Sequence, residues 1–86
     1  HYGRISQLLK IEFFKQLAVL IESGVALPES LLIVADQLHH PGIQEIIHEV
    51  ADMVDQGNAL SAALCARANV FDPITVQLAK AGEESG

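Results

Sequence analysis

The sequence predicts an all-α fold, a small antiparallel bundle of about five helices, on the basis of three observations. Apolar residues recur at every third or fourth position, which is the spacing that gathers side chains on one face of a helix. Glycines and prolines separate these stretches at places where helices end or begin. No stretch alternates strictly between apolar and polar residues, as a half-buried strand would.

The first helix is predicted between Ile5 and Ser23. Its apolar residues share one face and are Leu8, Leu9, Phe13, Leu17, Leu20 and Ile21. Because Phe14 and Ala18 widen this face, we expect the helix to lie centrally and to be largely buried. Gly24 follows at the position where a left-handed residue ends a helix without steric cost.

The second helix is predicted to begin at Pro28, since a missing N–H has no consequence in a first turn. Its inner residues are Leu27, Leu31, Val34, Ala35 and Leu38. A break follows from His39 to Gly42, in which we expect both His39 and His40 to be solvated.

The third helix is predicted to follow this break and to end at Gly57. It has the clearest apolar face, formed by Ile43, Ile46, Ile47, Val50, Ala51 and Val54.

The fourth helix is predicted to be short and to be capped by Asn58 or Ser61. Its buried residues are Leu60, Ala63 and Leu64. Cys65 follows them, and we expect it to be a small, semi-buried apolar residue. As the single cysteine, it excludes an internal disulfide and any zinc site with several cysteines.

The fifth helix is predicted from Pro73 to Ala81, with Asp72 as its N-cap. Phe71 precedes the cap, where it can pack back onto the first turn as a hydrophobic staple. Gly82 is predicted to end this helix.

The length of the chain predicts a single domain. Its 86 residues are too few for two hydrophobic cores, so we expect residues 1–86 to form one domain. Because the sequence starts at His1 and not at Met, we interpret it as a fragment of a longer chain.

Charge is unevenly distributed along the chain. Eleven carboxylates against five Lys and Arg give a net charge of −6, which disfavours binding to nucleic acid or to an anionic membrane. No Lys or Arg occurs between Lys15 and Arg67, so the second and third helices present an acidic outer surface. This surface either keeps the domain soluble or docks a basic partner. The candidate docking residues on it are Glu45, Glu49, Asp52 and Asp55.

Candidate sites for chemistry are few, and the sequence predicts neither an enzyme nor a cofactor. It holds no glycine-rich phosphate loop, no serine elbow and no paired carboxylates in an apolar setting. The third helix carries weak candidate metal ligands at i, i+3 and i+4 spacing, which are Glu45, His48, Glu49 and Asp52. Weak calcium or magnesium binding is favoured there over a transition metal, because hard cations accept oxygen shells completed by water.

Several short stretches occur in an order that is more specific than the composition. They are FKQLA (14–18), LIESGVAL (20–27), GNALSAAL (57–64), VFDP (70–73) and AGEESG (81–86). From about residue 5 to the end, the chain resembles the cytoplasmic domain of the type II secretion system F family. This family comprises the inner-membrane platform proteins of type II secretion and type IV pilus assembly. The motif residues that we interpret as architectural are Gly24, Pro28, Gly57, Leu60, Leu64, Phe71, Pro73 and Gly82.

The resemblance implies a scaffold on the cytoplasmic side of the bacterial inner membrane. Such a scaffold would couple a secretion or pilus ATPase to the assembly of pilins or pseudopilins, bind other cytoplasmic assembly proteins and self-associate. The residues do not distinguish a secretion system from a pilus or DNA-uptake system. Two other functions are compatible with them: a stand-alone helical adaptor and a small divalent-cation-binding regulator.

The end of the chain departs from the family pattern. The family domain is similar to a six-helix bundle, and its last helix follows the segment 82–86, where this chain ends. Glu83 and Glu84 then either favour the start of that helix through its dipole or contact a partner. Without a sixth helix an apolar groove is left open, and we expect a dimer or a helix-swapped arrangement through helix faces.

Overall fold

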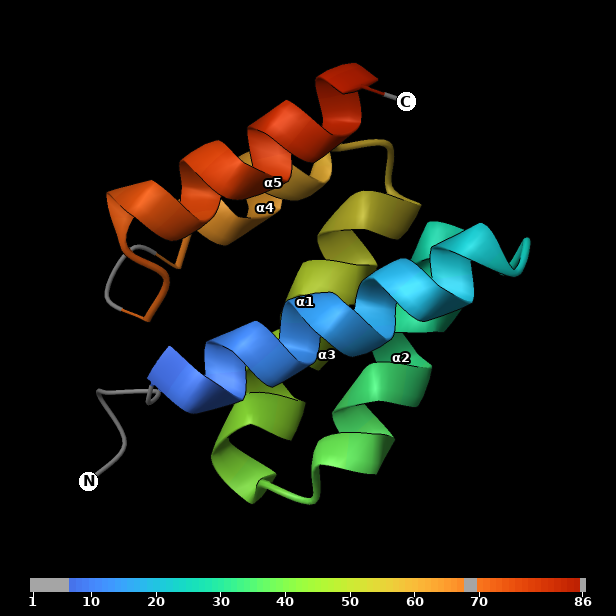
Figure 1. Ribbon diagram of the computed structural model, residues 1–86. Helices are drawn as coiled ribbons and strands as arrows, with labels where there is room; N and C mark the ends of the chain where they lie inside the picture. The colour runs from blue at the N-terminus through green and yellow to red at the C-terminus, as the bar shows by residue number, and fades with distance from the viewer. Residues whose placement is uncertain (1–6, 68–69, 86) are drawn as a thin grey trace.

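Five helices make up the part of the chain that the computed structural model describes, residues 7–67 and 70–85. They are α1 (Gln7–Glu22), α2 (Leu27–Leu38), α3 (Pro41–Asp55), α4 (Leu60–Cys65) and α5 (Pro73–Ser85). Each helix packs against the one before it in the chain, and no strand occurs among the described residues (Figure 1). The predicted all-α class and the five helices are confirmed, while the predicted start at Ile5 lies outside the described residues.

The hydrophobic core lies mainly between α2, α3 and α4. The apolar face predicted for α3 is buried apart from Val54, which is half-buried. Phe71, just before α5, is fully buried and its ring centroid lies 6.1 Å from that of Phe13 on α1. The aromatic pair therefore joins the last part of the chain to the first. The other fully buried large side chains include Leu31, Val34 and Leu64.

The predicted glycine and proline signals hold at most helix ends. Gly24 and Gly57 have φ angles of 94° and 107°, in the left-handed region that glycine adopts without a Cβ clash. Pro73 is the first residue of α5, and the Asp72 carboxylate accepts the backbone N–H of Thr75 at 2.8 Å. Asp72 is therefore the N-cap that its sequence position predicts.

Gly82 does not end α5, so this prediction was wrong. The helix continues through Gly82 to Ser85. Glycine costs about 1 kcal/mol within a helix. The last turn makes a contact that offsets this cost, because the Glu83 carboxylate accepts both the backbone N–H and the hydroxyl of Ser61, at 2.9 and 2.8 Å.

The predicted caps of α4 were also wrong. Ala59 is the N-cap, and it has no side-chain oxygen to offer. The Asn58 side chain instead donates to the carbonyl of Met53 at 2.9 Å and so closes the end of α3. The Ser61 hydroxyl donates to Glu83, as described above. Consequently α4 is capped across the bundle by a carboxylate from α5, a contact between distant residues that the local pattern does not encode.

Both histidines of the break are exposed, as predicted, yet each also shapes the backbone. His39 adopts a left-handed conformation with φ 52° at the end of α2. The Nδ1 atom of His40 accepts the backbone N–H of Ile43 at 3.1 Å. His40 is therefore the N-cap of α3, which begins at Pro41, two residues before the first apolar residue of its predicted face.

Helix α1 is less buried than predicted. Phe13 and Leu17 are buried, but Leu8 is 79% and Ile21 44% exposed, although all four belong to the predicted apolar face. The reason is that α1 packs against α2 and makes no helix packing contact with α5. Cys65, predicted as semi-buried, is exposed on the outer side of α4.

Candidate interaction surfaces

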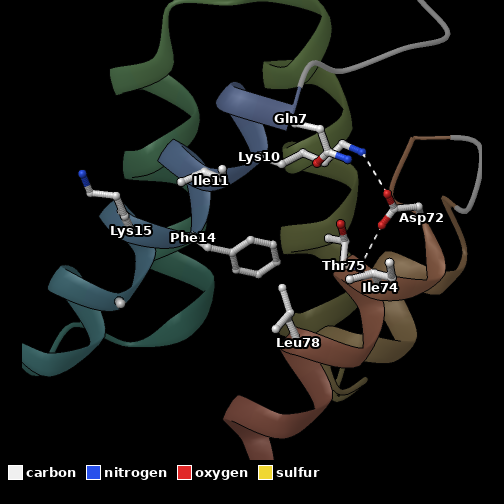
Figure 2. A pocket seen from close by; sticks show the side chains of 10 residues that line it. Gln7, Lys10, Ile11, Phe14, Lys15, Asp72, Ile74, Thr75 and Leu78 are labelled. Atoms are coloured by element: carbon white, nitrogen blue, oxygen red, sulfur yellow. Dashed lines mark hydrogen bonds and ion pairs between the residues drawn. The ribbon is translucent and has the colours of Figure 1, made fainter.

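An apolar groove lies between α1 and α5. It has a volume of about 600 Å³. Its α1 wall includes Ile11 and Phe14, and its α5 wall includes Ile74 and Leu78, with the Phe14 ring directed toward α5 (Figure 2). Three of these side chains are mostly exposed, namely Ile11, Ile74 and Leu78. The expected open apolar groove is therefore present between these two helices.

One end of this groove is polar, and its side chains are joined by an ion pair and a hydrogen bond. Lys10 lines it with a side chain that is only 10% exposed, and its ammonium lies 3.6 Å from the carboxylate of Asp72. Figure 2 shows this ion pair next to the hydrogen bond between Asp72 and Thr75. Hydrogen bonds from Thr75, first from its side chain and then from its backbone, lower the pKa of the Asp72 carboxyl, and the charge of Lys10 adds a smaller lowering.

Sequence reasoning missed Lys10 as a site residue. Its position does carry a signal, because Lys10, Phe13, Phe14 and Leu17 follow the i, i+3, i+4, i+7 spacing of one helix face. A cation within such an apolar row indicates a partner on a neighbouring element. The identity of that partner, Asp72, depends on the fold, since 62 positions separate the two residues.

The outer face of α3 is acidic, as predicted. All the candidate residues on this helix are exposed, and they are Glu45, His48, Glu49, Asp52 and Asp55. Glu49 is engaged within the molecule, because its carboxylate accepts a hydrogen bond from Arg67 at 2.7 Å. Among the described residues, no group of three or more His, Cys, Asp or Glu side chains is arranged to hold a metal ion.

Glu83 and Glu84 have different surroundings, although they are adjacent. Glu83 binds Ser61 through both carboxylate oxygens, which gives it an architectural role that the sequence analysis did not consider. Glu84 is exposed, and its side chain makes no hydrogen bond or ion pair within the part of the chain that the structure describes. Of the two predicted docking candidates at the end of α5, Glu84 is therefore the one whose carboxylate is not engaged by another described residue.

None of the described helices combines the length and the apolar character that crossing a lipid bilayer requires. The longest is α1, with 16 residues, and about 20 apolar residues are needed to span the hydrocarbon core.

Comparison with protein families matches residues 13–86 to the family described as type II secretion system (T2SS), protein F. The match covers α2 to α5 and most of α1. It also contains the buried apolar core and the α5 wall of the groove, but it leaves out Lys10 and Ile11 of the α1 wall.

Three curated relatives illustrate the similarity. The type IV pilus assembly protein PilC of Myxococcus xanthus is 35% identical over 74 residues, which are 86% of this chain and 18% of the relative. The type II secretion system protein F of Vibrio cholerae is 39% identical over 72 residues, 84% of the chain and 18% of the relative. The protein transport protein HofC homolog of Escherichia coli is 33% identical over 75 residues, 87% of the chain and 19% of the relative. The chain thus spans about a fifth of the length of these relatives.

Proposed function

We propose that this chain, which belongs to the type II secretion system protein F family, is a cytoplasmic scaffold domain of an inner-membrane platform protein. In this proposal it has no catalytic activity and no cofactor. It couples a secretion or pilus ATPase to the assembly of pilins or pseudopilins and to protein export. The full-length polypeptide is held in the membrane by segments other than α1 to α5, and the chain also associates with copies of itself.

The observation that carries the docking part of this proposal is the division of α3 into two faces. Its inner face is committed to the core by residues such as Ile43, Ile47 and Val50, each fully buried. Its outer face presents exposed carboxylates, of which Glu45 and Asp52 make no ion pair among the described residues. A rigid helix that shows a row of carboxylates to solvent is suited to binding a basic surface of a partner.

A charge-reversal experiment tests the docking face. We expect Glu45→Lys together with Asp52→Lys to weaken binding of the cytoplasmic ATPase of the same system by roughly 3- to 10-fold at low salt, because two attractive contacts become repulsive. The difference should shrink as salt is raised, since exposed charges are screened. Binding is measured over a salt series. Glu49 is left unchanged, because its reversal would also break the ion pair with Arg67.

The matched control is Glu22→Lys together with Asp36→Lys. Both residues are exposed, and their reversal changes the net charge by the same amount from positions on α1 and α2. We expect this variant to bind the ATPase nearly as well as the unmodified chain. Equal affinity of all three proteins at every salt concentration would reject the α3 face as the docking surface.

A further inference from the structure

Gly82 has a different backbone conformation from the glycines that follow α1 and α3. Gly24 and Gly57 each lie two residues beyond their helix and have positive φ angles. Gly82 also follows a stretch of helix-forming residues, but its φ is not positive and α5 continues through it to Ser85. The same residue type, in a similar setting, thus ends two helices and is contained in a third.

Packing does not require a glycine at position 82. The residue is exposed, and a Cβ atom there would meet no other described atom within 4 Å. Glycine therefore differs from alanine at this position in two respects. It disfavours the helical conformation by about fivefold, and it enters the left-handed conformation without steric cost. The backbone can leave the helix at Gly82 more readily than at the other residues of α5.

The last turn of α5 is held by polar contacts. It consists of Gly82, Glu83, Glu84 and Ser85 and so contributes no apolar side chain to the core. It lies beside the start of α4, where Glu83 accepts the backbone N–H and the hydroxyl of Ser61, both exposed to solvent (Figure 1). A helix cap of this kind typically favours the capped form by about fivefold. Because this gain is similar to the cost of the glycine, the helical and unwound forms of the turn differ in population by roughly tenfold or less.

The first turn of α4 depends on the same contact. The backbone N–H groups at the start of a helix have no partner within the helix, and a side-chain oxygen of the N-cap residue usually accepts one of them. The N-cap of α4 is Ala59, which has only a methyl group, and Glu83 accepts the N–H of Ser61 in its place. If the last turn of α5 unwinds, α4 loses this cap.

From these observations we propose that the last turn of α5 is a latch with two states. In the closed state Gly82 is helical and Glu83 caps α4. In the open state Gly82 adopts the left-handed conformation, α5 ends there, and the carboxylate of Glu83 is released beside that of Glu84. The latch couples the backbone at Gly82 to the first turn of α4. A cationic group that binds the released carboxylates favours the open state and thereby uncaps α4. The latch involves α4 and α5 and operates without docking on the α3 face.

Two mirror-image substitutions at one position test the latch. Gly82→Ala favours the right-handed helix, and Gly82→D-Ala favours the left-handed conformation. Both add the same methyl group to a position with open space around it. The single cysteine, Cys65, allows a synthetic peptide of residues 65–86 to be ligated to the rest of the chain, so both variants can be made. Hydrogen exchange of the Ser61 amide, followed by NMR, reports how often the latch is open.

The two substitutions should change this exchange rate in opposite directions. We expect Gly82→Ala to slow exchange of the Ser61 amide by about three- to fivefold and Gly82→D-Ala to accelerate it by at least about twofold. The amide of Ile43 is the matched control. It also lies in the first turn of a helix, but its acceptor is the neighbouring His40 Nδ1 at 3.1 Å, so its exchange should not change.

A second pair of variants tests the carboxylate of the latch. Glu83→Ala should accelerate exchange of the Ser61 amide as Gly82→D-Ala does, because the acceptor is absent in one variant and displaced in the other. Glu84→Ala should leave the rate unchanged.

The same Ser61 exchange rate in the chains with glycine, alanine and D-alanine at position 82 would overturn the proposal, because the backbone there would not control the cap. Equal changes at Ser61 and Ile43 would overturn it as well, because the substitutions would then act on the stability of the whole domain. Opposite changes at Ser61 with none at Ile43 would support it.

Discussion

Helices α3 and α1 are similar in length and in the spacing of their apolar residues, yet they end with different degrees of burial. On α3, residues such as Ile43, Ile46 and Val50 are buried. On α1, Leu8 and Ile21 are exposed although they belong to the predicted apolar face. The cause is the number of neighbouring helices, because α3 packs against both α2 and α4, whereas α2 is the one helix against which α1 packs, its other contact being that of Phe13 with Phe71. Periodicity thus states which residues share a face, and the neighbouring helices decide whether this face is buried.

The two sides of the molecule are also stabilised differently. The α2–α3–α4 side is held by apolar packing. The same apolar cluster extends to the other side through Phe13 and Leu17 of α1, Phe71, and Ala79 of α5. On that side α5 packs along α4, the ion pair between Lys10 and Asp72 links the start of α5 to α1, and Glu83 links its last turn to α4. Substitutions on the two sides should therefore differ in size, and the following predictions run from the largest effect to the smallest.

The same leucine-to-alanine substitution should destabilise the domain strongly in the core and hardly at all in the groove. Leu64→Ala removes a fully buried side chain and should lower the free energy of unfolding by about 2–5 kcal/mol. Leu78→Ala removes a side chain that is 62% exposed and should change it by about 0.5 kcal/mol or less. Urea denaturation of the 86-residue chain measures both. A similar loss for the two variants would mean that the groove is closed in the isolated chain.

The cap that α5 provides to α4 should have an intermediate effect. Glu83→Ala removes two hydrogen bonds to Ser61 and should cost about 1 kcal/mol relative to Glu84→Ala. The two substitutions are on the same helix and change helix propensity equally, so their difference isolates the cap. Thermal unfolding of both variants measures it. If they unfold at the same temperature, the contact with Ser61 does not stabilise the bundle.

The Asp72 carboxylate at the polar end of the groove should make the free energy of unfolding depend on pH. The pKa of Asp72 is lowered in the folded state, so its ionised form contributes stability above the ordinary carboxyl pKa of about 4 and loses this contribution as pH falls through the lowered value. Asp72→Asn keeps a capping oxygen and removes the charge. We expect the variant to be less stable than the unmodified chain near neutral pH and the difference to disappear in acid. Urea denaturation at several pH values checks this, and a pH-independent difference would contradict it.

Local sequence signals were sufficient for the helix ends that depend on neighbouring residues. Gly24 and Gly57 adopt the left-handed conformation, and Asp72 caps α5, because each effect involves residues within one turn. The signals failed at Gly82 and at the cap of α4. There the deciding contact joins Ser61 to Glu83, which are 22 positions apart. A residue-by-residue pattern carries no information on such a contact before the helices are placed.

The sequence by itself determined the five amphipathic helices, the acidic outer face of α3 and membership of the T2SS F family, because these follow from residue types and their order along the chain. Only the tertiary structure decided that α1 and α5 stand apart, that Lys10 meets Asp72 between them and that Glu83 caps a different helix. The physical reason is that helix formation depends on contacts within a few residues, whereas burial and the pairing of charges depend on which distant segments lie beside one another.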